Sequence, residues 1–177
     1  MLDVLLDVAE LWGMYVISLL RKAATPLAVI HGTRDKAATK KLLHSHVTGQ
    51  GLGTLIPDAI FHAGGKIQGV ADAKYKSLHP SASEPNGAQR EDLYQMAAYL
   101  GRFVPPYGGV SWGLLAYPLD PARPSIPQAE QFSPWSLDGG RNVVFTSLPH
   151  VASDAVTKLR ALIVRMAPER YIWQAQA

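Results

Sequence analysis

The fold is decided by residues 54–76, which read TLIPDAIFHAGGKIQGVADAKYK. Two largely apolar runs, 54–61 and 66–76, are joined by His62-Ala-Gly-Gly65. A Gly-Gly pair between apolar runs is a hairpin signal, because glycine adopts the positive φ that tight turns require. The segment therefore predicts two neighbouring antiparallel strands.

Polar residues interrupt both of these strands. Because side chains alternate along a strand, Asp72 and Lys74 share one face, and pairing can bring Asp58 beside Asp72. Two close carboxylates repel each other, and Mg²⁺, or Mn²⁺ in its place, would relieve that repulsion while accepting phosphate oxygens as ligands. The Ala73 carbonyl is a further candidate ligand. Lys74 can orient a water molecule or neutralise charge that grows on a phosphate.

A helix is expected at residues 90–103, where apolar residues recur at helical spacing and Pro105 follows. Gln95 and Tyr99 are four residues apart, so they lie on one face of this helix. Their side chains can bind a phosphate or a metal-bound water. The competing interpretation is that Tyr99 is a core residue and that Asp72 and Lys74 form an exposed ion pair of little energetic value. An acid within an apolar strand argues against it, because an unpaired buried charge is costly.

The rest of the chain predicts an α/β fold with a mixed sheet flanked by helices. We expect one domain over 1–177. Its elements are a helix at 2–22, core strands and a helix within 54–117, and a C-terminal strand and helix within 142–166, the last helix capped by Ser153. Residues 33–48 are expected to form a loop or a solvent-exposed helix, and residues 120–140 a loop.

The composition excludes some classes of function but does not identify one. The 177 residues are 47% hydrophobic, enough for a core, and the net charge of +3 is compatible with nucleic acid. The absence of cysteine excludes disulfides, thiolate zinc sites and a cysteine nucleophile. Asp3, Asp7 and Glu10 interrupt the apolar first segment, so we expect an amphipathic helix, no membrane association and a cytoplasmic location.

The three motifs together resemble the PD-(D/E)xK nuclease superfamily, whose RecB-like branch carries the Gln-x-x-x-Tyr element. They read Pro57-Asp58, Asp72-Ala-Lys74 and Gln95-x-x-x-Tyr99. The sequence around these motifs, from the first helix to about Tyr117, looks like the nuclease domain of the McrC proteins, which are the cleavage subunits of McrBC modification-dependent restriction systems.

This resemblance implies a restriction-endonuclease-like core and a Mg²⁺-dependent endonuclease that hydrolyses phosphodiester bonds of DNA in antiviral defence. By position, Asp58 and Asp72 resemble the metal-binding acids, Lys74 the catalytic lysine, and Gln95 and Tyr99 the polar pair on the helix. It also implies an AAA+ GTPase partner of the McrB type, because this sequence has no Gly-rich phosphate loop. Cutting both strands of a duplex calls for two active sites, so a dimer is one expected arrangement.

The chain departs from the family pattern in its first helix. The family has a glutamate that assists the metal site where this chain has Gly13. Glu10 lies one turn earlier on the same face and is the expected substitute as a metal ligand. The alternative is a catalytically impaired nuclease-fold module that serves DNA binding or complex assembly.

Overall fold

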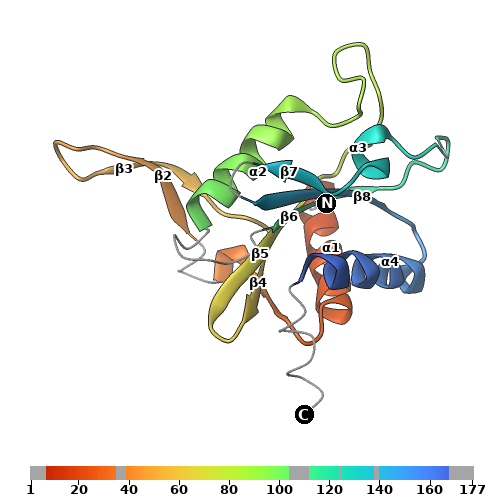
Figure 1. The fold of residues 1–177 in the computed structure, drawn as a ribbon, viewed down its shortest axis with the longest axis horizontal. Helices are drawn as coiled ribbons and strands as arrows, with labels where there is room; N and C mark the ends of the chain where they lie inside the picture. The colour runs from red at the N-terminus through yellow and green to blue at the C-terminus, as the bar shows by residue number, and fades with distance from the viewer. Residues whose placement is uncertain (1–6, 35–38, 104–111, 124, 138–139, 168–177) are drawn as a thin grey trace, which may run out of the picture.

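The computed structural model describes residues 7–34, 39–103, 112–123, 125–137 and 140–167. A six-stranded mixed sheet lies between helices, and a separate two-stranded hairpin stands beside it (Figure 1). The expected α/β fold with a mixed sheet flanked by helices is confirmed. The six-stranded sheet has the order β1-β4-β5-β6-β8-β7, formed by Ala28–His31, Ala59–Ala63, Lys66–Ala73, Trp112–Pro118, Arg141–Leu148 and Trp135–Leu137.

The predicted hairpin forms the second and third strands of this sheet. Strands β4 and β5 pair in antiparallel fashion, with Ala59 opposite Ala71, and Gly64 and Gly65 both have positive φ in the turn. β6 continues the sheet parallel to β5, and β8 parallel to β6. β1 and β7 lie at the two edges, each antiparallel to its neighbour.

Helices cover the two faces of the sheet and divide the core into two layers. Helices α1 (Val8–Ala23) and α4 (Ala152–Met166) pack on one face, against alternate β6 residues such as Trp112 and Leu114. Helix α2 (Arg90–Phe103) packs on the other face, against Leu115 and Tyr117. This alternation explains why β6 is apolar almost throughout, because strands covered on both faces bury every side chain.

Helix α1 begins where its sequence supplies a cap. The Asp7 carboxylate accepts hydrogen bonds from the backbone N–H groups of Ala9 and Glu10, at 2.9 and 3.1 Å. Such a cap stabilises a helix by about 1 kcal/mol. The part of the expected helix that falls in residues 1–6 lies outside the described residues. Within the described ranges, no helix is long and apolar enough to cross a membrane.

The expectation for residues 33–48 is wrong in its largest part. Apart from a short 3₁₀ turn, η1 (Gly32–Arg34), the structure has strand β2 (Lys40–His44) there, paired with β3 (Gly51–Leu55). The two strands are stabilised by pairing with each other and not by a buried face. Their sequence therefore lacks the apolar-polar alternation by which half-buried strands are recognised.

Two further expectations need correction in the C-terminal half. Residues 120–140, expected as a loop, contain helix α3 (Gln128–Gln131) and edge strand β7 (Trp135–Leu137), both too short to show a periodic pattern. Ser153 does not cap α4. The cap position is Val151, which makes no side-chain cap bond, and Ser153 lies in the first turn.

Candidate active site

The two acids and the lysine lie where β4 begins and β5 ends. Asp58 directly precedes β4, Asp72 lies within β5, and Lys74 is the first residue after Ala73 ends that strand. The Asp58 segment is held by a close backbone approach. The Gly32 N–H donates to the Asp58 carbonyl at 3.0 Å, and a Cβ at position 32 would lie 1.7 Å from the Pro57 carbonyl oxygen. Only glycine fits there.

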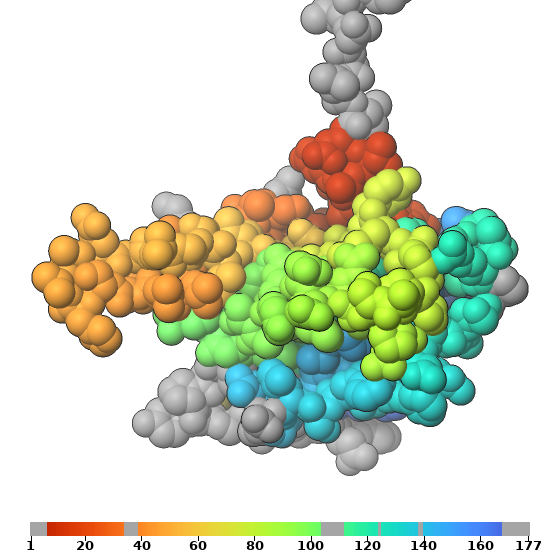
Figure 2. Space-filling model, turned by 90° about the horizontal axis from the view of Figure 1, so that it is seen from above, coloured from red at the N-terminus to blue at the C-terminus, as the bar shows by residue number. Residues whose placement is uncertain are grey.

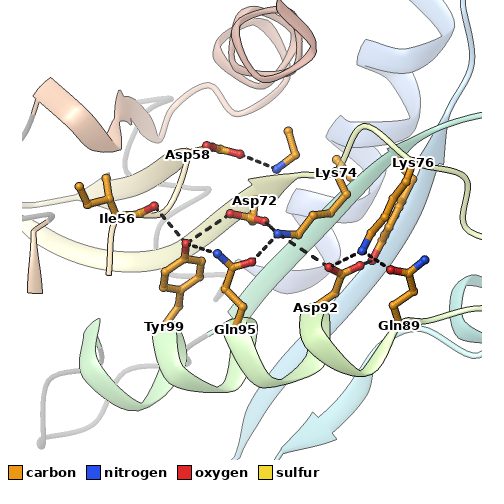
Figure 3. A network of polar contacts seen from close by, with 12 residues as sticks. Ile56, Asp58, Asp72, Lys74, Lys76, Gln89, Asp92, Gln95 and Tyr99 are labelled. Carbon is orange, nitrogen blue, oxygen red and sulfur yellow. Dashed lines mark hydrogen bonds and ion pairs between the residues drawn. The ribbon is translucent and has the colours of Figure 1, made fainter. Parts of the chain in front are cut away.

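Four of the predicted catalytic residues, Asp72, Lys74, Gln95 and Tyr99, are joined in one hydrogen-bonded network, and Asp58 lies beside it (Figure 3). The Asp58 carboxylate accepts a hydrogen bond from the Ala73 N–H at 2.8 Å. The Lys74 ammonium forms an ion pair with Asp72 Oδ2 and donates to Gln95 Oε1. Gln95 Nε2 in turn lies 2.8 Å from the Tyr99 hydroxyl.

Tyr99 connects the helix to both acid-bearing segments. Its hydroxyl donates to the Ile56 carbonyl at 3.0 Å and lies 3.4 Å from Asp72 Oδ1. Burial, followed by the nearby charges of Asp72 and Asp58, raises the pKa of Tyr99 well above its ordinary value. The hydroxyl therefore keeps its proton and acts as a donor.

Asp72 is the electrostatic centre of the network. Only 5% of the residue is exposed, and this burial raises the pKa of its carboxyl above the usual range. Lys74 opposes the shift, while Asp58 adds to it because like charges disfavour ionisation. Among the described residues, the partner of Asp72 Oδ2 is the Lys74 ammonium, and no well-formed hydrogen bond reaches that atom.

These features fit a hard divalent cation. Mg²⁺ is commonly bound through one or two carboxylates and keeps several waters. Asp58 and Asp72 can supply the carboxylates beside the Ala73 backbone, and the poorly satisfied Asp72 Oδ2 is the oxygen that would gain most from a cation. The described part of the chain holds no group of three His, Cys, Asp or Glu side chains placed for a metal, so an all-protein cage does not fit.

Glu10 and Gly13 approach the site from α1 without completing it. Both line a hollow of about 430 Å³ whose wall also includes Asp58. Glu10 is exposed, and no hydrogen bond or ion pair joins its carboxylate to another described side chain. A Cβ at Gly13 would meet nothing within 4 Å. The hollow therefore has room for the side chain that the family pattern expects.

A third acid, which sequence reasoning missed, extends the network. Asp92 is buried, with 3% of the residue exposed, and its carboxylate accepts hydrogen bonds from Lys76 Nζ at 2.8 Å and the Tyr117 hydroxyl at 2.9 Å. Its Oδ1 atom lies 3.8 Å from Lys74 Nζ. Gln89 Oε1 accepts a further bond from Lys76. The available signal was helical spacing, because Asp92 and Gln95 are three residues apart.

Comparisons with known proteins identify the family. A protein-family model described as "McrBC 5-methylcytosine restriction system component" matches residues 2–118. A search of curated proteins finds no match. Among solved structures, the fold is similar to a chain in the Thermococcus gammatolerans half-complex of McrB AAA+ hexamers with bound McrC, with a TM-score of 0.63 and 14% identity. The match covers 90% of this chain and 33% of that chain, so this chain spans about a third of its neighbour's length. On the family match over residues 2–118, the chain belongs to the family of McrBC 5-methylcytosine restriction system components.

Proposed function

We propose that this chain is a single McrC-type nuclease domain that hydrolyses phosphodiester bonds of DNA with the help of Mg²⁺. One observation carries the proposal. The buried Asp72 forms an ion pair with the Lys74 ammonium, and the charge of Asp58 helps to raise its pKa; each of the three comes from a predicted motif position. A purely structural ion pair does not require a second acid that raises the pKa of the first.

The chain's own residues divide the work. Asp58 and Asp72 would hold the metal, which supplies a water of lowered pKa and Lewis-acid stabilisation of the phosphate. Lys74 places a positive charge beside Asp72, where it can stabilise charge on a phosphate oxygen. Gln95 accepts a hydrogen bond from Lys74 and holds its ammonium in place. Tyr99 fixes both the Ile56 segment and Gln95.

The partners follow from the family and the neighbouring fold. The McrC neighbour is bound to McrB AAA+ hexamers, and we propose an AAA+ partner of that type for this chain. DNA is the proposed substrate. Cleavage of both strands would require a second nuclease site, supplied by another copy.

A second candidate function is a nuclease-fold module without full activity. Gly13 favours it, because the α1 wall of the hollow beside Asp58 lacks the family's glutamate. Such a module would keep DNA binding or assembly and bind the metal weakly.

Plasmid cleavage tests the proposed function. The purified protein, alone and with an AAA+ partner, is incubated with plasmid DNA in Mg²⁺ or in a chelator. Cleavage should need the metal and should be lost in Asp72→Asn but kept in Glu91→Gln, which changes an exposed acid of α2. Undiminished cutting by Asp72→Asn would refute the site. Metal-independent DNA binding without cutting would favour the second candidate.

A further inference from the structure

The β2–β3 hairpin, residues 40–55, projects from the body of the molecule along its longest axis (Figure 1, Figure 2). Helix α2 contacts the hairpin only near its base, and every residue from 42 to 54 is exposed. Leu43 is 58% exposed, Leu52 69% and Val47 94%. A two-stranded hairpin is only marginally stable by itself. Apolar side chains that stay exposed on such an element are typical of a binding surface.

The charge of the hairpin indicates the class of partner. Residues 39–55 contain Lys40, Lys41, His44 and His46 and no acidic residue. The chain as a whole has 14 acidic residues against 17 lysines and arginines, so this segment is free of acids in a nearly balanced protein. Two adjacent lysines in a segment without acids complement a polyanion such as the phosphate backbone of DNA.

The base of the hairpin is attached to the candidate site. Arg102 Nε of α2 donates to the Lys41 carbonyl at 3.0 Å, and the Tyr99 hydroxyl donates to the Ile56 carbonyl, also at 3.0 Å. The helix that carries Gln95 thus holds β2 and the residue that directly follows β3. Leu55, the last residue of β3, is followed after two residues by Asp58. A ligand bound along the hairpin is therefore positioned relative to the site acids.

The size and the tip of the hairpin suit a duplex groove. Each strand has five residues, which span about 17 Å. The major groove of B-DNA is about 12 Å wide and admits a two-stranded β-ribbon. The tip is an ordered turn, in which Ser45 Oγ accepts hydrogen bonds from the N–H groups of Val47 and Thr48. Val47 lies in this turn and is almost fully exposed.

We propose that the β2–β3 hairpin is a DNA-binding arm. It lies along the duplex beside the bond that is cut, with the side chains of Lys40, Lys41, His44 and His46 on phosphates and Val47 in the groove. This inference rests on the proposed function, because DNA is the substrate that both share. It assigns the hairpin to positioning the duplex and not to chemistry.

DNA affinity measured without cleavage tests the arm. A short labelled duplex is titrated with the protein in Ca²⁺, with fluorescence anisotropy as the readout and the salt concentration varied. The double variant Lys40→Ala/Lys41→Ala should bind about tenfold more weakly at about 0.1 M salt, equally for two unrelated sequences. The slope of log affinity against log salt should fall in magnitude by about two. The matched control Lys22→Ala/Lys66→Ala removes two exposed lysines from α1 and the start of β5 and should leave both quantities unchanged.

Lys41 Nζ also donates to Thr54 Oγ1 at 2.6 Å within the hairpin, so replacing Lys41 can disturb the structure of the hairpin itself. A second variant that leaves this bond in place separates a loss of structure from a loss of DNA contacts. Val47→Glu alters only an exposed tip and should likewise weaken binding, several-fold. Native affinity and slope in both hairpin variants, an equal loss in the control, or no duplex binding by the native protein would overturn the arm. So would hairpin variants that bind DNA normally but no longer bind an AAA+ partner, which would assign the surface to protein. The proposed function fails separately, if Asp72→Asn still cuts.

Discussion

At the scale of single residues, Asp72 is a proposed functional group whose burial lowers the stability of the fold. Its carboxyl is buried beside another acid, and burial raises its pKa more than Lys74 lowers it. A group whose pKa is raised in the folded state binds protons more tightly there than in the unfolded chain. Its ionised form therefore costs stability above the ordinary carboxyl range, and the cost disappears as the pH falls below that range.

Replacing Asp72 with asparagine should therefore stabilise the fold while abolishing cleavage. We expect a gain in unfolding free energy of roughly 1 kcal/mol near neutral pH, the common size of such relief at an active site. The gain should shrink toward zero as the pH is lowered below about 3, where the carboxyl is protonated in both states. Urea unfolding at several pH values measures it. Glu91→Gln, an exposed site on α2, should show no gain, and a pH-independent effect of Asp72→Asn would contradict the explanation.

Asp92 is expected to matter through packing and positioning. Asp92→Ala removes the acceptor of the buried Tyr117 hydroxyl and of Lys76, so the fold should lose about 1–3 kcal/mol. Denaturant unfolding of Asp92→Ala, Tyr117→Phe and the double variant forms a double-mutant cycle. The two losses should not add, because both variants break the same hydrogen bond. Strict additivity would show that Asp92 and Tyr117 do not interact.

At the scale of elements, α1 carries the proposed departure from the family pattern, at Gly13. Gly13 weakens the helix interior, and nothing lies within 4 Å of a Cβ placed there. Gly13→Ala and Gly13→Glu should both stabilise the fold by about 0.5–1 kcal/mol. Only Gly13→Glu should also tighten metal binding and speed cleavage, because it alone adds a carboxylate to the hollow lined by Asp58. Equal activity of the two variants would show that Glu at position 13 does not take part in this site.

Elements also differ in how far the sequence predicts them. The arrangement of Asp58, Asp72 and Lys74 could be anticipated because it follows from local alternation across one tight hairpin. The β2–β3 hairpin could not, because its exposed strands lack an amphipathic pattern. Asp92 could not be predicted because its contacts with Lys74 and Lys76 depend on how α2 packs over the end of β5, and the sequence does not show this tertiary packing. Glu10 stays a prediction as a metal ligand, since its carboxylate is exposed on the wall of the hollow.

At the scale of the whole molecule, metal binding should appear as global stability. A ligand that binds only the folded state stabilises it by mass action, by about 1.4 kcal/mol at ten times its dissociation constant. Mn²⁺ should therefore raise the melting temperature of the native protein, because it relieves the repulsion between Asp58 and Asp72. Thermal melts followed by circular dichroism measure the shift. It should vanish in Asp58→Asn/Asp72→Asn, and an undiminished shift there would place the metal elsewhere.

We propose that Lys74, which contacts both Asp72 and Gln95, acts on a phosphate at a metal site formed by Asp58 and Asp72. The most direct test is the single-turnover rate of DNA cleavage at saturating Mn²⁺, in the complex with the AAA+ partner, for the native protein and for Lys74→Met. Lys66→Met, at the exposed first residue of β5, is the control. We expect the cleavage rate of Lys74→Met to fall by about a hundredfold or more, while its DNA affinity is unchanged and the control cleaves at the native rate. A Lys74→Met protein that cleaves DNA at the native rate would contradict this proposal.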